Sequence, residues 1–133
     1  MLQITKKYSE KRAFITGAAS GLGKALAIHL AQDGWTVGIT DLNKERLQKV
    51  KNQIEALGGT AHDFAFDVSN KVAYEQVVEE FLLQVGGIDL LINNAGIMIP
   101  PFSLTQDGFE SQMAANYFGH FLLTSLLLPM IRN

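Results

Sequence analysis

Residues 12–26 read RAFITGAASGLGKAL, an apolar run followed by three glycines in a short loop and then by an apolar helical pattern. The glycines are Gly17, Gly21 and Gly23. Because glycine has no Cβ, such a loop can turn sharply and let the backbone approach a bulky anion closely. A helix that starts at the loop points free N–H groups and the positive end of its dipole at that anion. The order of strand, glycine loop and helix therefore predicts a site for the pyrophosphate of a dinucleotide.

The composition is that of one folded domain. The 133 residues are 47% hydrophobic and 18% charged, with a net charge of −2 and no cysteine, which excludes disulfides and thiolate metal sites. Ten of the eleven Lys and Arg residues lie at or before Lys71, and they form no cationic stripe of the kind that binds nucleic acid. Residues 1–12 lack the apolar core of a secretory signal, and the apolar stretch 121–131 is too short to span a bilayer. We therefore expect a single domain over residues 1–133, located in the cytoplasm, with no nucleic-acid partner and no membrane span.

Short apolar runs alternate with amphipathic helical patterns along the rest of the chain. Strands are expected at residues 13–16, 36–40, 61–66 and 88–92, the last one apolar and buried on both faces. Four helices separate or follow these strands. The first ends at Gly34, the second ends before Gly58, and the third begins at about Asn70. The fourth is long and covers residues 106–128, with Thr105 as its N-cap. The apolar stripes of the first two helices are Leu22, Leu26 and Leu30, then Leu47, Val50, Ile54 and Leu57.

Four strands that are each followed by a helix predict an α/β fold. Right-handed crossovers place the helices on both faces of a parallel sheet. The expected architecture is a doubly wound, Rossmann-type sheet with strand order 3-2-1-4, and its ligand lies where the order reverses, between strands 1 and 4.

A phosphate-binding P-loop is the nearest rival interpretation of the glycine loop, because Lys24 follows Gly23. That motif requires a glycine at position 18 and a Ser or Thr at position 25, and the chain has Ala18 and Ala25 there. The P-loop is therefore excluded. Close packing of strand and helix, with no ligand, stays as the second alternative for the loop.

Asp41 stands at the end of the second strand, eighteen residues after Gly23. A carboxylate there can accept hydrogen bonds from the adenosine ribose and repel a 2′-phosphate. Residue 42 is a leucine, and residues 18–22 contain no Arg or Lys that could bind that phosphate. NAD(H) is therefore favoured over NADP(H). The competing interpretation is a turn aspartate that precedes Asn43.

Two further segments close the third and fourth strands. Asp67-Val68 would reach the adenine from the third strand end, and Asn93-Asn94-Ala95-Gly96 would border the switch point with small and amide side chains. Each of these segments by itself is also compatible with plain turn chemistry.

Together these motifs resemble the short-chain dehydrogenase/reductase family over essentially the whole chain, and the wording of residues 107–128 is most similar to retinol-dehydrogenase-type members. The resemblance implies that the glycine loop holds the pyrophosphate, Asp41 the ribose and Asp67-Val68 the adenine. It also implies that Asn116, in the long helix, belongs to the catalytic group. The cofactor-binding residues implied are Thr16, Gly17, Ser20, Gly21, Leu22, Gly23, Asp41, Leu42, Asp67, Val68, Asn94, Ala95 and Gly96.

The family's catalytic tyrosine and lysine have no counterpart in these residues. In the family a tyrosine exchanges the proton, a lysine four residues later lowers the tyrosine pKa, and a serine polarises the substrate oxygen. The residues four beyond Tyr8, Tyr74 and Tyr117 are Arg12, Val78 and Phe121, and no lysine follows Lys71. We expect the cofactor-binding part of an NAD(P)-dependent oxidoreductase that interconverts an alcohol and a carbonyl, cut before its catalytic serine, tyrosine and lysine. The alternative is a short, non-catalytic NAD-binding or interaction module.

Three further expectations concern the surface. His29, His62 and His120 do not have the spacing of metal ligands, so no metal site is predicted and packing roles are favoured. The long helix over 106–128 is expected to pair two copies of the chain. The strand at 88–92, without a fifth strand beside it, would be an apolar edge that makes the isolated chain marginally stable or prone to self-association.

Overall fold

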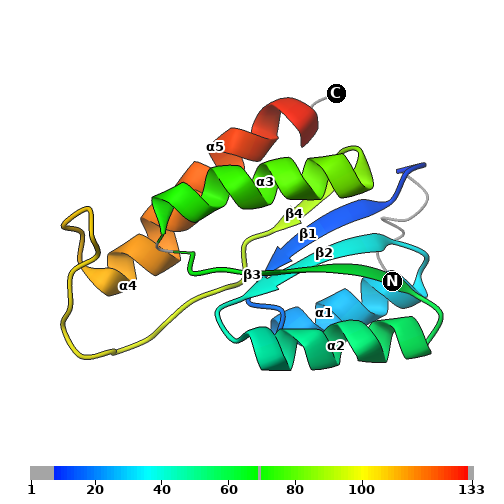
Figure 1. Cartoon of the computed structure of the whole chain (residues 1–133), viewed down its shortest axis with the longest axis horizontal. Helices are drawn as coiled ribbons and strands as arrows, with labels where there is room; N and C mark the ends of the chain where they lie inside the picture. The colour runs from blue at the N-terminus through cyan, green and yellow to red at the C-terminus, as the bar shows by residue number, and fades with distance from the viewer. Residues whose placement is uncertain (1–7, 69, 132–133) are drawn as a thin grey trace.

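Four parallel strands form one sheet with the order β3-β2-β1-β4 in the computed structural model (Figure 1). The structure describes residues 8–68 and 70–131. Most of the segment 1–12, which was considered as a signal sequence, lies outside the described residues, and so does Arg132. The strands are β1 (Arg12–Thr16), β2 (Thr36–Asp41), β3 (Thr60–Ala65) and β4 (Leu90–Ile92). The predicted strand order and the doubly wound α/β class are therefore confirmed.

Helices cover both faces of the sheet. Figure 1 shows α1 and α2 against one face, and α3 with the C-terminal helix against the other. The helical segments are α1 (Gly21–Gln32), α2 (Lys44–Ala56), α3 (Lys71–Val85), α4 (Ser111–Met113), the π-helical η2 (Ala114–Phe118) and α5 (Gly119–Ile131). The last three form one continuous helix, because residues 111–131 follow each other without a break.

The alternation of side chains along β1 divides the core in two. Ala13 and Ile15 face α1 and α2, whereas Phe14 faces α3 and α5. Successive strand residues point to opposite faces, so a strand covered by helices on both faces is apolar throughout. On the second face Phe14, Phe64 and Phe81 pack ring against ring, with centroids 4.9 to 6.2 Å apart.

Capping residues set several helix ends, of which the start at Asn70 and the end at Gly34 are predicted from the sequence. The Asn43 side chain accepts a hydrogen bond from the Arg46 N–H, and the Asn70 side chain accepts from Val72 and Ala73. Gly34 and Gly86 follow α1 and α3 with φ of +86° and +83°, a conformation that glycine adopts without steric cost.

The stripe predicted for α1 is wrong. Its buried residues are Gly23, Ala27 and Ala31, while Leu22 is 68% exposed and Leu26 and Leu30 are half-buried. Small residues bring α1 close to the sheet; Leu22 lies outside this contact, whereas Leu30 still packs against the edge of the core. In α2 the predicted stripe holds except at its end, where Leu57 is exposed.

The fourth strand is shorter and less buried than predicted. It covers only Leu90–Ile92, its three residues are half-buried, and it pairs with β1 alone. Asp89 lies just before the strand, where its carboxylate accepts hydrogen bonds from the Arg12 N–H (2.9 Å) and Nε (3.0 Å). The Arg12 guanidinium holds the pKa of Asp89 below its usual range, mainly through this side-chain hydrogen bond.

The long helix begins five residues later than predicted. Thr105 is not its N-cap, because residues 106–108 form a turn in which Gly108 has φ of +80°. Glu110 caps the helix instead, with carboxylate oxygens 2.9 and 3.0 Å from the N–H groups of Gln112 and Met113. The helix then continues to Ile131, past Pro129.

Among the described helices, residues 111–131 alone have the length and hydropathy that a bilayer span requires. This apolar segment is longer than the stretch 121–131 considered from the sequence. Leu123 and Leu127 are fully buried on the α3 side of the sheet, so part of its apolar surface belongs to the protein core.

Candidate functional site

A cleft of about 440 Å³ lies at the carboxyl ends of the strands, next to the loops that follow the neighbouring strands β1 and β4. We call it the strand-end cleft. Nine of the predicted site residues line it, from four separate segments of the chain. These residues are Gly17, Ser20, Asp41, Leu42, Asp67, Val68, Asn94, Ala95 and Gly96. The predicted convergence at the switch point of the sheet is therefore present.

The remaining predicted residues lie around the strand-end cleft and do not line it. Thr16 is fully buried beneath the loops, and Gly23 is buried behind Gly17. Gly21 and Leu22 are exposed in the first turn of α1. Asn116, in η2, follows Ala115, which does line the cleft.

Two of the three glycines in the glycine loop, Gly17 and Gly23, have no room for a side chain. A Cβ at Gly23 would collide with the carbonyl oxygen of Gly17, and a Cβ at Gly17 would lie 2.8 Å from the Ala95 Cα. Gly17 and Gly21 also have φ of +67° and +54°, which L-residues rarely adopt. The loop backbone therefore packs directly on the 94–95 segment and leaves the cleft side open.

The N-terminus of α1 faces this loop with unpaired donors. The first N–H groups of a helix have no intrahelical acceptor, and the side chain of the N-cap Ser20 forms no capping bond. Twelve residues of aligned peptide dipoles add positive potential at this end. The glycines let the loop backbone pack closely, and the start of the helix offers N–H donors. Both features fit the binding of a pyrophosphate group.

Thr16 joins the glycine loop to the segment after β4. Its hydroxyl oxygen accepts hydrogen bonds from the Asn94 and Ala95 N–H groups, both at 2.9 Å. The Asn94 side chain returns two bonds, from Nδ2 to the carbonyl oxygens of Thr16 (3.1 Å) and Gly17 (3.2 Å). One hydroxyl and one amide thus fix the relative position of the two loops.

The carboxylate of Asp41 is held in place by two backbone N–H groups. Oδ2 accepts from Ala19 in the glycine loop and Oδ1 accepts from Asn43, both at 3.1 Å. The second bond is the turn interaction that the alternative interpretation predicts, and the first ties Asp41 to the loop. Asp41 also lines the strand-end cleft, where its unused lone pairs can accept from ribose hydroxyls.

Asp67 and Val68 form the opposite side of the strand-end cleft, after β3. The Val68 carbonyl accepts a hydrogen bond of 2.6 Å from the Tyr74 hydroxyl. Burial raises the pKa of Tyr74 far above its ordinary value, so this phenol stays protonated and serves as a donor. Its role here is to fix the Val68 backbone.

Asn116 occupies the π-helical segment and clamps the backbone of Ile97. Its Oδ1 accepts from the Ile97 N–H (2.8 Å), and its Nδ2 donates to the Ile97 carbonyl (2.7 Å). π-helical turns are often found at functional sites. The side-chain amide of Asn116 thus holds the segment that borders the cleft through one bond from each end, and it keeps a second N–H and a second lone pair.

Sequence reasoning missed several residues of the cleft. Phe66, Ile97, Ser111 and Ala115 also line it. Phe66 and Ile97 adjoin predicted motifs, so widening each motif by one residue finds them. Ser111 and Ala115, four apart on the long helix, become visible only once the packing of that helix is known. The place of His120 also becomes visible only from the packing of this helix. From the sequence it had a packing role, and in the structure its Nε2 lies 3.0 Å from the Thr16 hydroxyl.

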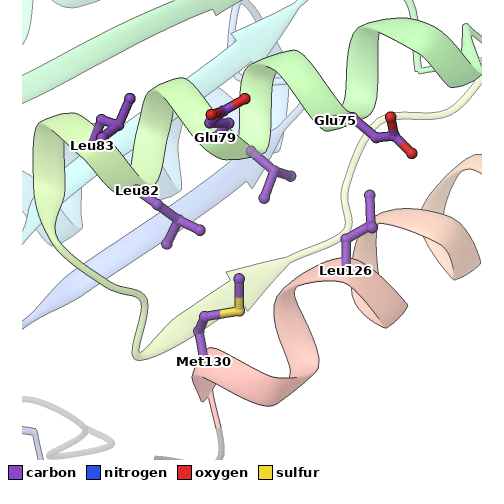
Figure 2. A pocket seen from close by; sticks show the side chains of 7 residues that line it. Glu75, Glu79, Leu82, Leu83, Leu126 and Met130 are labelled. Atoms are coloured by element: carbon purple, nitrogen blue, oxygen red, sulfur yellow. The ribbon is translucent and has the colours of Figure 1, made fainter.

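A second hollow of about 510 Å³ lies between α3 and α5. Figure 2 shows Leu82 on α3 opposite Met130 and Leu126 on α5, with Glu75 and Glu79 further along α3. None of the residues predicted to bind the cofactor lines this hollow. The strand-end cleft is therefore the candidate functional site.

Comparisons with known proteins show what the whole chain is similar to. A family model described as short chain dehydrogenase matches residues 11–133. An uncharacterized oxidoreductase of Schizosaccharomyces pombe is 40% identical over 92% of this chain and 37% of its own length. Retinol dehydrogenase 11 of Mus musculus is 37% identical over 92% of this chain and 39% of its own. The chain thus spans less than two fifths of the length of these relatives.

Solved structures show the same fold. A metagenomic short-chain oxidoreductase in complex with NADP has a TM-score of 0.80 and 30% identity, covering 92% of this chain and 57% of the other. A 3-ketoacyl-ACP reductase from Sinorhizobium meliloti has a TM-score of 0.80 and 34% identity, covering 91% and 49%.

Proposed function

This chain belongs to the short-chain dehydrogenase family, and from that membership we propose that it is the cofactor-binding portion of an NAD(P)-dependent oxidoreductase that interconverts an alcohol and a carbonyl. One observation carries the proposal: the backbones at Gly17 and Gly23 approach their neighbours so closely that no side chain fits. This packing leaves the donor-rich N-terminus of α1 open toward the strand-end cleft. A nicotinamide dinucleotide bound there would supply or accept the hydride.

We assign a separate part of the dinucleotide to each segment of the strand-end cleft. The N–H groups at the start of α1 would bind the pyrophosphate, Asp41 the adenosine ribose, and Asp67-Val68 the adenine. Asn94, Ala95 and Gly96 would flank the nicotinamide half. The support is positional: along the sheet order β3-β2-β1-β4, these segments would bind adenine, ribose, pyrophosphate and nicotinamide in turn, and residues from each of them line the one cleft.

The proton donor would come from elsewhere in a longer protein. No tyrosine of the chain is followed four residues later by lysine, and Asn116 bonds to the Ile97 backbone. We propose that Asn116 supports a proton relay by holding this segment. The length of the relatives supports a longer parent enzyme. A non-catalytic NAD-binding module is the second candidate, because these residues lack the catalytic tyrosine and lysine. Turnover of an alcohol by the parent protein with bound nucleotide would support the enzyme, and binding without turnover would support the module.

The preference for NAD(H) over NADP(H) is a further proposal. It rests on the anchored Asp41 carboxylate beside Leu42, which is 72% exposed and has no cationic group. A carboxylate at this position repels a 2′-phosphate. The similar metagenomic structure is a complex with NADP, so the fold alone does not decide between the two nucleotides.

Replacing Asp41 by Asn tests this assignment. Calorimetric titration should show that the wild-type protein binds NADH more tightly than NADPH, and that Asp41→Asn improves NADPH binding by about tenfold by removing a like-charge contact. Asp33→Asn, at an exposed carboxylate beyond α1, is the matched control and should leave both affinities unchanged. Tighter binding of NADPH by the wild-type protein would contradict the preference.

Three expectations from the sequence stay predictions. They are a single domain over residues 1–133, cytoplasmic location, and pairing of two copies through the long helix. Exposed apolar residues on the helix, among them Tyr117 and Phe121 at 58% and 68% exposure, support the pairing.

A further inference from the structure

His120 is the buried imidazole of the long helix, and it contacts the deepest residue of the nucleotide site. It is 9% exposed, Thr16 is fully buried, and the two side chains meet at 3.0 Å across 104 residues of sequence. Thr124, one turn further on, donates to the His120 carbonyl and accepts from Asn93 Nδ2. The helix is thus joined to β1 and to the segment after β4 on this side.

The hydrogen bonds at Thr16 fix the protonation state of His120. A hydroxyl oxygen has two acceptor sites, and at Thr16 the Asn94 and Ala95 N–H groups occupy both. The Thr16 hydroxyl proton therefore has to be donated, and His120 Nε2 is its partner. Nε2 can accept only when it carries no proton, so the imidazole is neutral with its proton on Nδ1.

We propose that His120 is a positioning residue whose neutral imidazole orients the Thr16 hydroxyl, so that nucleotide binding weakens when His120 is protonated. A protonated Nε2 would point a third donor at an oxygen with no acceptor site left. Thr16 would then lose its hydrogen bond to His120 or one of its hydrogen bonds from the Asn94 and Ala95 N–H groups. Because Asn94 also holds the Gly17 carbonyl, the disturbance reaches the glycine loop. This inference rests on the proposed nucleotide binding.

The surroundings of His120 favour the neutral form. Burial lowers its pKa from the ordinary value of 6.5, and a hydrogen bond with the Asn116 backbone opposes this shift. The helix itself carries no Asp, Glu, Lys or Arg between residues 111 and 131. β1 contributes the neutral Thr16, and residues 93–97 are uncharged. α3 contributes Tyr74, whose hydroxyl packs beside Gly119 and stays protonated.

Three variants test the inference by calorimetric titration of NAD⁺ between pH 5 and 8. His120→Gln supplies an acceptor that does not titrate, and His120→Phe retains the ring but removes the acceptor. His29→Gln, on the exposed side of α1, is the matched control. The ligand titrates identically in every sample, so the readout is the ratio of affinities between variants at each pH.

The expected result is that wild type and His29→Gln lose about tenfold in affinity relative to His120→Gln as the pH falls below the pKa of His120. His120→Phe should bind weakly at every pH. Equal pH dependence in wild type and His120→Gln would overturn the inference. Absence of NAD⁺ binding by wild type at all pH values would overturn the proposed function along with it.

A spectroscopic measurement gives an independent readout. Linkage requires that a ligand which binds the neutral form lowers the titration midpoint of His120, by about one pH unit for a tenfold coupling. NMR of the imidazole resonances should show this change at His120 and not at His29 or His62. A midpoint at His120 that nucleotide leaves unchanged would overturn the inference.

Discussion

Gly38 in β2 shows how tightly single residues define this core. A Cβ at this position would lie 2.5 and 2.7 Å from the Phe81 ring and 2.9 Å from the Phe14 ring. The two phenylalanines come from α3 and β1 and meet edge to face with centroids 4.9 Å apart. The missing side chain of Gly38 therefore makes the space in which the aromatic rings pack.

Replacing Gly38 by Ala should lower the free energy of unfolding by about 1–3 kcal/mol, because the added methyl group overpacks the rings. Phe81→Leu in the same chain removes most of the collision. Chemical denaturation of the two single variants and the double variant should then give a double variant less destabilised than the sum of the singles. Additive losses would show that the methyl group is accommodated in another way.

The individual residues that sequence could identify are those whose role depends on near neighbours. The glycine spacing predicted Gly17 and Gly23, and the strand end predicted Asp41, because loop and strand are adjacent in sequence. The contacts of Thr16 with His120, and of Asn116 with Ile97, join residues 104 and 19 positions apart. No local pattern encodes such pairs, since they follow from how the long helix packs.

At the scale of elements, capping chemistry and apolar spacing each predicted part of the helices: Gly34 does end α1, whereas Thr105 does not cap the long helix. Asn43 and Asn70 cap α2 and α3 with side chains that accept from N–H groups in the first turn. The apolar stripe of α1 misled, because a helix that starts at a glycine loop buries small residues against the strand end. The start of the long helix was misplaced because Gly108 closes a turn that local propensity did not reveal.

The difference between Thr105 and Glu110 can be measured. Glu110→Ala should lower the melting temperature more than Thr105→Ala, because Glu110 accepts from two N–H groups and Thr105 accepts from Phe109 at 3.3 Å. The backbone N–H groups of Gln112 and Met113 lower the Glu110 pKa, so its contribution is present above the ordinary value and lost as the pH falls through the lowered one. Thermal melts of both variants at pH 7 and pH 3 check the order of the two effects and the pH dependence of the Glu110 cap. A larger effect of Thr105→Ala would contradict the cap at Glu110 and favour the helix start predicted at residue 106.

At the scale of the whole molecule, the alternation of strands and helices predicted a parallel sheet, and the strand–glycine loop–helix motif selected the order 3-2-1-4 among doubly wound sheets. Short crossovers and their right-handed preference leave few other arrangements. The sequence could not predict where β4 begins, since the ion pair of Asp89 with Arg12, just before the strand, joins residues 77 positions apart. β4 pairs on one side with β1 only, so the predicted self-association through this edge stays open to measurement.

The central claim is that the glycine loop, α1 and the 94–96 segment together hold a nicotinamide dinucleotide. Gly23→Ala places a methyl group against the Gly17 carbonyl and the Asn94 amide, which should push these segments apart. Gly58→Ala is the control for general destabilisation, because its positive φ of +81° makes alanine strained there although the surrounding space is open, and Gly58 does not line the strand-end cleft.

Calorimetric titration of NADH and NADPH into the wild-type protein and these two variants is the most direct test. The account predicts saturable one-to-one binding by wild type and by Gly58→Ala, and loss of binding in Gly23→Ala. Absence of binding of both nucleotides by the wild-type protein, or equal binding by Gly23→Ala, would contradict it.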